Sequence, residues 1–261
     1  MELTFYKYQG TGNDFIMIDN RDLTFPKADT KLVAHLCDRK FGVGADGLIL
    51  LEEHPEFDFE MVYYNSDGNQ SSMCGNGGRC LVAFAKKLNW IKNKAIFFAI
   101  DGLHHATVSN EGIVSLQMRD VLSINKMDNA VFLDTGSPHH VELRENLENL
   151  NVKEAGAVIR YSDTYIAKGT NVNFVEQISD SNFAVRTYER GVEDETLSCG
   201  TGVTAVALAM FATQKTESKS VDLKVMGGTL NVSFEPINTG FKNIFLTGPA
   251  QFVFKGIFKL A

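Results

Sequence analysis

The chain contains one short element twice, and this duplication constrains its fold more than any other feature. Residues 73–78 read Met-Cys-Gly-Asn-Gly-Gly, and residues 198–203 read Ser-Cys-Gly-Thr-Gly-Val. In each copy a cysteine stands directly before a Gly-x-Gly turn, which opens into an apolar run of helical character. The match extends at an offset of 124 to 125 residues, which aligns Cys74 with Cys199. The sequence therefore predicts two similar halves, each with a thiol at the start of a helix.

The length of the chain agrees with two lobes. At 261 residues, each half has about 120 residues, an ordinary size for a domain. We expect an N-terminal lobe over residues 1–121 and a C-terminal lobe over residues 122–250. The last strand, 251–254, has no obvious partner in the second half. We therefore expect residues 251–261 to cross back and join the first lobe.

Short stretches rich in β-branched or aromatic residues, bounded by turn residues, predict strands in both halves. In the first half they cover residues 3–8, 15–19, 47–51, 59–64, 95–100, 104–108 and 114–118. In the second half they cover residues 131–134, 171–175, 183–188, 221–225, 229–234 and 244–246. Helices are expected over residues 30–39, 77–88 and 202–213.

The helix that follows the second cysteine is apolar on every face, which is typical of a buried helix rather than one at a surface. The predicted fold class is α+β. We expect two pseudo-symmetric lobes, each a strongly curved, barrel-like β-sheet around a central helix.

Composition excludes several classes of function. The formal net charge is −7 and no cluster of Lys or Arg compensates it, so we expect no nucleic-acid partner. No apolar stretch approaches the length of a membrane span, and the first residues lack a signal pattern. We therefore expect no membrane partner, a cytoplasmic location and four reduced cysteines. No Cys-x-x-Cys pair is present, so we expect no metal.

One glycine motif points to a cofactor but stands in the wrong context. Residues 42–47 match the pattern Gly-x-Gly-x-x-Gly. They follow an expected helix and precede an expected strand, which is the reverse of the order in dinucleotide-binding folds. We expect no cofactor.

The chemistry of a thiol at a helix start favours acid/base catalysis. The helix dipole stabilises a thiolate by roughly 1 to 2 kcal/mol in a partly buried site, which brings the pKa of a thiol about one unit closer to neutrality. Backbone N–H groups of the same turn bind anions such as a carboxylate. If two such thiols face one carbon, repulsion between like charges leaves one thiolate and one thiol. This arrangement predicts inversion at a carbon beside a carboxylate.

Six motifs, in order along almost the whole chain, resemble those of the diaminopimelate epimerase family. They are Gly10-Thr11-Gly12-Asn13-Asp14-Phe15, Tyr64-Asn65-Ser66-Asp67-Gly68, residues 73–80, Gly136-Ser137-Pro138-His139, Tyr188-Glu189-Arg190-Gly191 and residues 198–202. The resemblance implies an epimerase independent of pyridoxal phosphate that interconverts LL- and meso-diaminopimelate on the bacterial route to lysine and peptidoglycan. It also implies a barrel around a helix in each lobe, and a homodimer.

The resemblance assigns roles to residues. Cys74 and Cys199 become the catalytic acid/base pair. The Gly75-Asn76 and Gly200-Thr201 amides would hold the carboxylate at the reacting carbon, and His139 and Glu189 would tune the thiols. The residues that would hold the polar groups of the substrate, mostly at its distal end, are Asn13, Asn65, Asn173, Glu189 and Arg190. The chain departs from the pattern at three positions: Gly47 replaces a glutamine of some members, Ser137 an asparagine and Thr201 a serine.

Other residues have simpler interpretations. Cys37 and Cys80 are read as core residues, and His104, His105 and His140 as strand or surface residues. Glu189-Arg190 could be a surface ion pair, but Glu189 aligns with Asn65, which favours the site. Two alternative functions stay open: a racemase of the same fold acting on another amino acid, and a non-catalytic protein that binds an amino acid. Retention of both thiols argues against the second, since binding needs neither.

Overall fold

The structure is a computed structural model, and it describes residues 2–259. The chain divides into two compact units. Unit 1 runs to Leu116 and resumes at Gly248, and unit 2 covers Gln117–Thr247. From the sequence we expect these boundaries at residues 121 and 250, and the domain limits themselves stay a prediction. No helix within residues 2–259 is long and apolar enough to cross a membrane.

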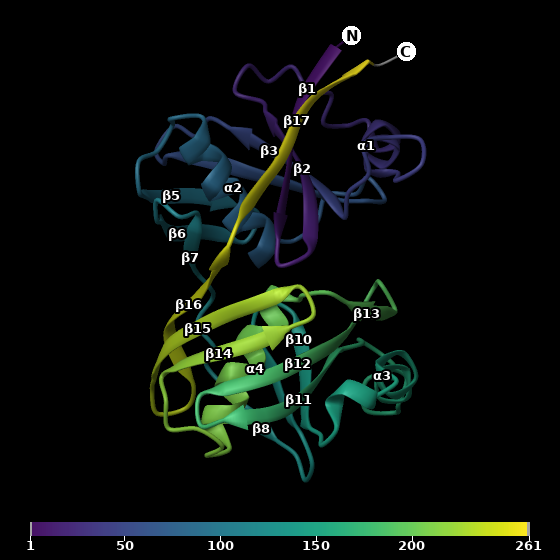
Figure 1. Cartoon of the computed structure of the whole chain (residues 1–261), viewed down its shortest axis with the longest axis vertical. Coiled ribbons are helices and arrows are strands. Elements are labelled where there is room, and N and C mark those ends of the chain that lie inside the picture. Colours follow the sequence, from purple (N-terminus) through teal and green to yellow (C-terminus); the bar gives the residue numbers. More distant parts are fainter. Residues whose placement is uncertain (1, 260–261) are drawn as a thin grey trace. The chain divides into compact units, whose positions relative to one another are not determined.

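Unit 1 contains a mixed sheet and two helices. Its strands are β1 (Glu2–Gly10), β2 (Asn13–Asp19), β3 (Gly47–Glu52), β4 (Phe59–Asn65), β5 (Lys94–Ala99), β6 (Gly102–Val108), β7 (Ile113–Gln117) and β17 (Gln251–Lys259). Its helices are α1 (Thr30–Cys37) and α2 (Gly75–Lys87). β17 pairs antiparallel with β1 along its length, as the yellow and purple strands of Figure 1 show. The expected return of the last strand to the first half is confirmed.

Unit 2 repeats this composition. Its strands are β8 (Asn125–Lys126), β9 (Val131–Asp134), β10 (Pro138–Leu143), β11 (Asn171–Ser179), β12 (Asn182–Glu189), β13 (Asp194–Thr196), β14 (Ser220–Val225), β15 (Gly228–Pro236) and β16 (Phe241–Pro249). Its helices are α3 (Val152–Arg160), α4 (Gly200–Ala212) and the short 3-10 helix η1 (Leu147–Asn149). Both α3 and β10 are absent from the sequence prediction.

The two units share one strand order and one pattern of directions. In unit 1 the order is β17-β1-β2-β3-β4-β5-β6-β7, with parallel contacts at β2–β3 and β4–β5. In unit 2 it is β8-β9-β10-β11-β12-β14-β15-β16, with parallel contacts at β10–β11 and β12–β14. A helix crosses over at each parallel contact, because parallel neighbours need a long connection. The duplication predicted from the cysteine elements therefore extends to the topology.

A central helix lies inside each curved sheet (Figure 1). In unit 1, α2 contacts β1, β2, β3, β6 and β17, which come from both ends of the strand order. In unit 2, α4 contacts β9, β10, β11, β12, β14 and β15. A sheet reaches one helix from both of its ends only if it curves around that helix. The predicted α+β class, with a central helix in each half, is confirmed.

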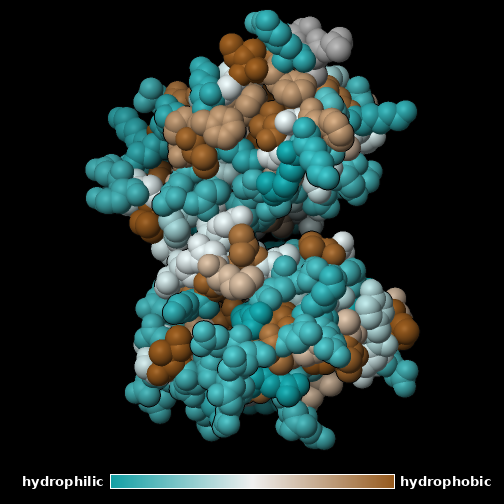
Figure 2. All heavy atoms as spheres, turned by 45° about the vertical axis from the view of Figure 1, so that its right-hand side comes forward, coloured by the Kyte–Doolittle hydropathy of each residue, from teal (hydrophilic) through white to brown (hydrophobic). Residues whose placement is uncertain are grey.

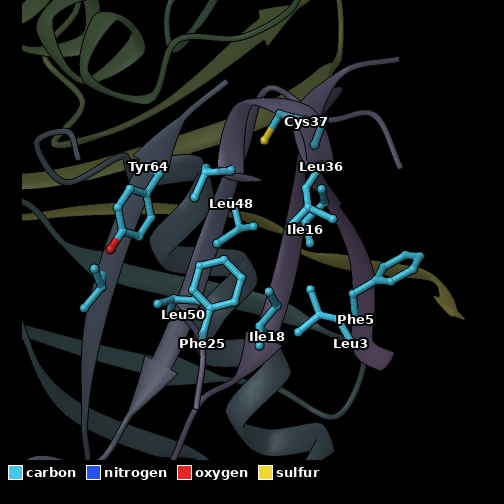
Figure 3. Packing of buried hydrophobic residues seen from close by; sticks show 13 residues of the cluster. Leu3, Phe5, Ile16, Ile18, Phe25, Leu36, Cys37, Leu48, Leu50 and Tyr64 are labelled. Carbon is cyan, nitrogen blue, oxygen red and sulfur yellow. The ribbon is translucent and has the colours of Figure 1, made fainter. Parts of the chain in front are cut away.

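The outer face of the unit 1 sheet packs on α1. All six residues of β3 are buried, because α2 covers one face of the strand and α1 the other. Figure 3 shows Leu36 and Cys37 of α1 beside Ile16 and Leu48 of the sheet. In unit 2, Val152 of α3 belongs to the corresponding cluster. Cys37 is therefore a core residue, as expected.

Candidate functional site

Cys74 is the N-cap residue of α2. Its backbone is extended (φ −106°, ψ 121°), and the first helical hydrogen bond runs from Gly78 N–H to the Cys74 carbonyl at 2.7 Å. The helix thus begins at Gly75, two residues before the predicted Gly77, because the extended cysteine already accepts a helical bond. Its side chain makes no capping hydrogen bond. The thiol therefore lies at the positive end of the helix dipole.

Close packing of α2 on the sheet of unit 1 explains why residue 77 is a glycine. A Cβ at Gly77 would lie 2.8 Å from the Ile49 Cδ1 of β3. The glycine lets the first turn of α2 approach the strand, which fixes where the cysteine lies.

Asn13 lies beside the Cys74 sulfur. Its Oδ1 is 3.7 Å from Cys74 Sγ and accepts a hydrogen bond from Asn76 Nδ2 at 3.3 Å. Its Nδ2 donates to Asp46 Oδ2 at 2.6 Å, which turns the amide oxygen towards the thiol. Unit 1 therefore brings together four of the predicted site residues, Asn13, Cys74, Gly75 and Asn76.

Asn65 lies at the same end of the sheet. Neighbouring strands place Phe15, Gly47 and Asn65 in one row, two residues along β2 from Asn13. The Asn65 side chain is exposed. Gly47 leaves no room for the glutamine of some relatives, because a Cβ there would lie 2.6 Å from both the Tyr63 ring and the Tyr64 carbonyl oxygen.

Cys199 holds the equivalent place in unit 2. It is the N-cap residue of α4, with φ −118° and ψ 110°, and Val203 N–H donates to its carbonyl at 3.0 Å. The helix begins at Gly200 rather than at the predicted Gly202, for the same reason as in unit 1. The Cys199 side chain makes no capping bond and lies 3.5 Å from Thr201 Oγ1.

A neutral hydrogen-bond network lies behind Cys199. Asn173 is fully buried, donates from Nδ2 to His139 Nδ1 and to the His140 carbonyl, each at 3.1 Å, and accepts from Thr187 Oγ1 at 3.0 Å. A Cβ at Gly202 would lie 2.5 Å from Asn173 Oδ1 and 3.3 Å from Cys199 Sγ. The glycine thus lets Asn173 approach the thiol. Asn173 therefore joins β10 and β12 next to the helix start that carries Cys199, and its predicted contact with a substrate stays a prediction.

His139 is a neutral imidazole in this network. Burial, and secondly the positive charge of Arg190, lower the pKa of His139 to about 3. Because Nδ1 accepts from Asn173, Nε2 carries the proton, and Nε2 has no hydrogen-bond partner among residues 2–259. His139 can influence Cys199 only as a neutral group; its predicted role in tuning the thiol stays a prediction.

Glu189 is the last residue of strand β12, and Arg190 follows it in the next turn. Glu189 Oε2 accepts from Thr196 Oγ1 at 2.9 Å, and the exposed Arg190 donates from Nη1 to the Lys168 carbonyl at 3.0 Å. The Arg190 amide donates to Asn171 Oδ1, and Asn171 Nδ2 in turn donates to Ser137 Oγ at 3.0 Å. Ser137, one of the three departures from the family pattern, therefore still supports this turn through its hydroxyl.

The other two thiols lack the properties of an acid/base pair. Burial raises the pKa of Cys37 and of Cys80 to about 12 each. Both side chains are core residues, as the sequence indicates. Three polar residues of the two half-sites were not singled out from the sequence: Asp46, Arg79 and Thr187. Arg79 stands inside the motif of residues 73–80 and Asp46 inside the glycine motif of residues 42–47. No quoted motif contains Thr187, whose contact with Asn173 depends on strand pairing.

Solved structures define the class of fold. The chain matches a PhzF-family phenazine biosynthesis protein from Bacillus anthracis with a TM-score of 0.76, covering 100% of both chains at 12% identity. It matches a hydroxyproline epimerase from Agrobacterium vitis with a TM-score of 0.71, covering 98% of this chain and 92% of that one at 14% identity. These likenesses show the fold alone, an α+β fold shared with a PhzF-family protein and a hydroxyproline epimerase.

Sequence comparison identifies the family. The family model described as diaminopimelate epimerase matches residues 5–121 and 131–253, and the chain belongs to this family. It is similar to the diaminopimelate epimerase of Flavobacterium psychrophilum, with 66% identity over 250 residues that cover 96% of this chain and 98% of the relative. The enzyme of Chlorobaculum tepidum is 43% identical over 261 residues, which cover 96% and 99%. The resemblance found in the sequence is confirmed.

Proposed function

We propose that this protein interconverts LL- and meso-diaminopimelate by a two-base reaction of Cys74 and Cys199. The observation that carries the proposal is the equivalent place of the two thiols, each the N-cap of the central helix of its unit. Family membership supports the substrate.

The reaction moves two protons. One cysteine, as thiolate, removes the α-proton from one face of the carbon, and the electron pair stays on that carbon beside the carboxylate. The other cysteine, as thiol, delivers its proton to the opposite face, so the configuration inverts. The Gly75-Asn76 and Gly200-Thr201 amides hold the carboxylate at the two helix starts, where the dipoles stabilise added negative charge. The reaction balances without a cofactor, because the thiolate accepts one proton from the substrate and the thiol donates one proton to it.

The distal amino-acid head of the substrate distinguishes this reaction from that of related racemases. We assign Arg190 to the distal carboxylate and Glu189 to the distal ammonium group, because their charges are complementary. Asn13 and Asn65 supply neutral hydrogen bonds, as does Asn173 with its remaining acceptor capacity. Asn65 and Arg190 are exposed and Asn13 is half-buried, so these side chains are accessible to a ligand.

The test is an epimerisation assay. Purified protein is incubated with LL-diaminopimelate without added pyridoxal phosphate, and the meso isomer is measured by chiral chromatography. We expect the meso isomer to accumulate in the wild type, and not in Cys74→Ala or Cys199→Ala. A faster racemisation of another amino acid, such as proline, would instead favour the alternative racemase function.

We also propose that the enzyme is a cytoplasmic homodimer, as the family resemblance implies. Apolar side chains of β17 are 40 to 61% exposed: Phe252, Val253, Phe254 and Ile257. Figure 2 shows apolar side chains gathered among hydrophilic ones on the surface of unit 1, to which β17 belongs. Such a patch is typical of a protein interface. Light scattering should give twice the 28.9 kDa chain mass for the wild type and the chain mass for Phe254→Asp; a monomeric wild type would exclude the dimer.

A further inference from the structure

The side chain of Glu193 joins three segments of unit 2. Its Oε2 accepts hydrogen bonds from the hydroxyls of Tyr161 and Tyr188, at 2.9 and 3.0 Å. Its Oε1 accepts from the amide of Gly191 at 3.1 Å and lies 3.6 Å from Nε of Arg160. These partners come from the end of α3, from strand β12 and from the turn that follows β12. One carboxylate therefore ties this turn to α3, which packs beside β12 and β13 (Figure 1).

The backbone of Glu193 has a conformation that favours glycine. Its φ is 57°, a left-handed value that is uncommon for a residue with a side chain. Its amide donates to the Glu189 carbonyl at 2.8 Å, which closes the turn through the backbone. A glycine would adopt this φ without cost, so closing the turn does not by itself need a glutamate. A side chain persists here only where its surroundings hold it, and the bonds to the carboxylate do so.

Arg190 lies between this turn and the connection that follows α3. Its Nη1 donates to the carbonyl of Lys168, in that connection, at 3.0 Å. A Cβ at Gly169 would lie 2.6 Å from Arg160 Cζ and 2.8 Å from Arg190 Cδ, so the glycine leaves room for both arginines. The place of the Arg190 guanidinium therefore depends on how the turn is held against the end of α3.

The bonds to Glu193 keep one direction at neutral pH. Burial opposes its charge, but the bonds from the Gly191 amide and the two tyrosine hydroxyls lower the pKa of its carboxyl below the usual value. Burial, and secondly the bond to this carboxylate, raise the pKa of Tyr188 to about 12, and the same bond raises the pKa of Tyr161. The carboxylate therefore stays an acceptor, and both hydroxyls stay donors.

Unit 1 holds the corresponding turn by different means. At the offset of 124 residues, Asn65 corresponds to Glu189. The turn after β4 closes with the Gly68 amide donating to the Asn65 carbonyl at 3.0 Å. Gly68 packs directly on the first residue of α1, because a Cβ there would clash with the Thr30 carbonyl oxygen. The backbone thus makes the contact with the helix in unit 1, whereas the side chain of Glu193 makes it in unit 2.

We propose that Glu193 is a positioning residue that holds Arg190 in place to bind the distal carboxylate of the substrate. The inference rests on the proposed function, which assigns that carboxylate to Arg190. Glu193 acts by fixing the turn against α3, and a guanidinium that is already fixed loses less freedom when the substrate binds. Removal of the carboxylate should therefore weaken substrate binding and leave the proton transfers nearly unchanged.

Steady-state kinetics with diaminopimelate tests the proposal. In Glu193→Ala, KM should rise about tenfold while kcat stays within about threefold, as expected when binding is weakened equally in the ground and transition states. Glu193→Gln keeps an oxygen that accepts a hydrogen bond, so it should restore part of the KM. Asp194→Asn is the matched control, because this carboxylate also joins the turn to α3, but its bonds go to Lys153 and to the Glu195 amide. Its KM should stay within about twofold of the wild type.

A second background separates positioning from a general loss of structure. If Glu193 acts through Arg190, Glu193→Ala added to Arg190→Met should raise KM no further. An equal rise in both backgrounds, or a loss of kcat without a rise in KM, would overturn the proposal. Circular dichroism establishes that each variant is folded. If Glu193→Ala does not fold, an unchanged KM in Glu193→Gln would overturn the proposal in its place.

Hydrogen exchange distinguishes a failure of this proposal from a failure of the proposed function. The Gly191 amide loses its acceptor in Glu193→Ala, so its exchange, measured by mass spectrometry without substrate, should speed up about tenfold. Asp194→Asn should leave this exchange unchanged. A wild type that does not epimerise diaminopimelate would overturn the proposed function, whereas unchanged exchange in folded Glu193→Ala would overturn the positioning role even in an active enzyme.

Discussion

The two halves of this protein share a backbone plan but differ in their electrostatics. Each half has the same order of strands, the same two parallel contacts and a central helix capped by a cysteine. Behind Cys74 lies the buried cation of Arg79, whereas behind Cys199 lies the neutral network of Thr187, Asn173 and His139. The comparison teaches that the repeated fold fixes the place of each thiol at the start of its central helix, whereas the side chains around each thiol are particular to its unit.

The largest expected effect comes from removing either thiol. Despite their different surroundings, the proposed reaction needs both cysteines, so Cys74→Ala and Cys199→Ala should each lose epimerase activity by about 10³-fold or more, within the range of general acid/base catalysis. Each variant should still eliminate a leaving group placed beside the α-carbon of a substrate analogue, since that step needs one base. Near wild-type epimerisation by Cys199→Ala would contradict the equivalence of the two thiols, because the thiol of unit 2 would then not be needed for the reaction.

The next effect concerns the proposed substrate contacts, which include the charged Glu189 and Arg190 in unit 2 but only the neutral Asn13 and Asn65 in unit 1. Arg190→Met should lower kcat/KM for diaminopimelate by about 10²-fold, and Asn65→Ala by about tenfold, because a site built to hydrogen-bond a group loses more when the contact is charged. Lysine, which lacks the distal carboxylate, should be a very poor substrate of the wild type. Steady-state kinetics with both amino acids measures this. Comparable turnover of lysine and diaminopimelate would contradict the assignment of Arg190.

A smaller effect distinguishes the two asparagines beside the thiols. Asn173→Ala leaves His139 Nδ1, the His140 carbonyl and Thr187 Oγ1 without their buried partner and should lower the free energy of unfolding by about 3 kcal/mol. Asn13 is half-buried, so water replaces its bonds, and Asn13→Ala should cost under about 1 kcal/mol. Urea unfolding compares the two. Equal losses would show that the Cys199 network is no more rigid than the surroundings of Cys74.

The last effect is the pH dependence of stability from His139. Its pKa in the folded protein is about 3, below the ordinary value of 6.5, so the unfolded chain binds the proton more readily. The free energy of unfolding should therefore fall by about 1.4 kcal/mol per pH unit as the pH drops from 6.5 towards 3, and this part should be constant above 6.5. The slope should be shallower in His139→Gln and unchanged in His105→Gln, whose histidine is exposed. Identical slopes in all three proteins would mean that His139 is not buried as a neutral group.

Local sequence patterns predicted the helices and strands whose own residues have a clear hydrophobic period or a clear capping residue. The helices after Cys74 and Cys199 were predicted to within two residues, and the buried course of the second followed from its apolar faces. The helix α3 was missed although Asn151 caps it, because Gly156 in its middle weakens the helical pattern. That glycine is required by packing, since a Cβ there would lie 2.4 Å from Tyr188 Cβ. The duplication alone would have predicted a helix here, because α1 occupies the equivalent place in unit 1, between two parallel strands.

The candidate site was predictable only in part. The cysteines, glycines and asparagines were found because the motifs repeat or resemble a family. Strand β10 is absent from the strands predicted from the sequence, since it begins at Pro138, which cannot donate a hydrogen bond to a strand. The partners of Asn173 and the burial of Arg79 depend on contacts between segments far apart in the chain, so no local pattern could reveal them.

The two-base reaction is tested most directly by the origin of the α-proton in the product. LL-diaminopimelate is converted in D₂O, and the reaction is stopped at low conversion to analyse both the product and the recovered substrate by mass spectrometry. We predict that the meso product carries one solvent deuterium at the inverted carbon while the recovered substrate keeps its protium, because the thiol that protonates is not the one that deprotonates. Product that retains the substrate's own α-proton would show that a single base serves both faces, and would contradict the reaction proposed for Cys74 and Cys199.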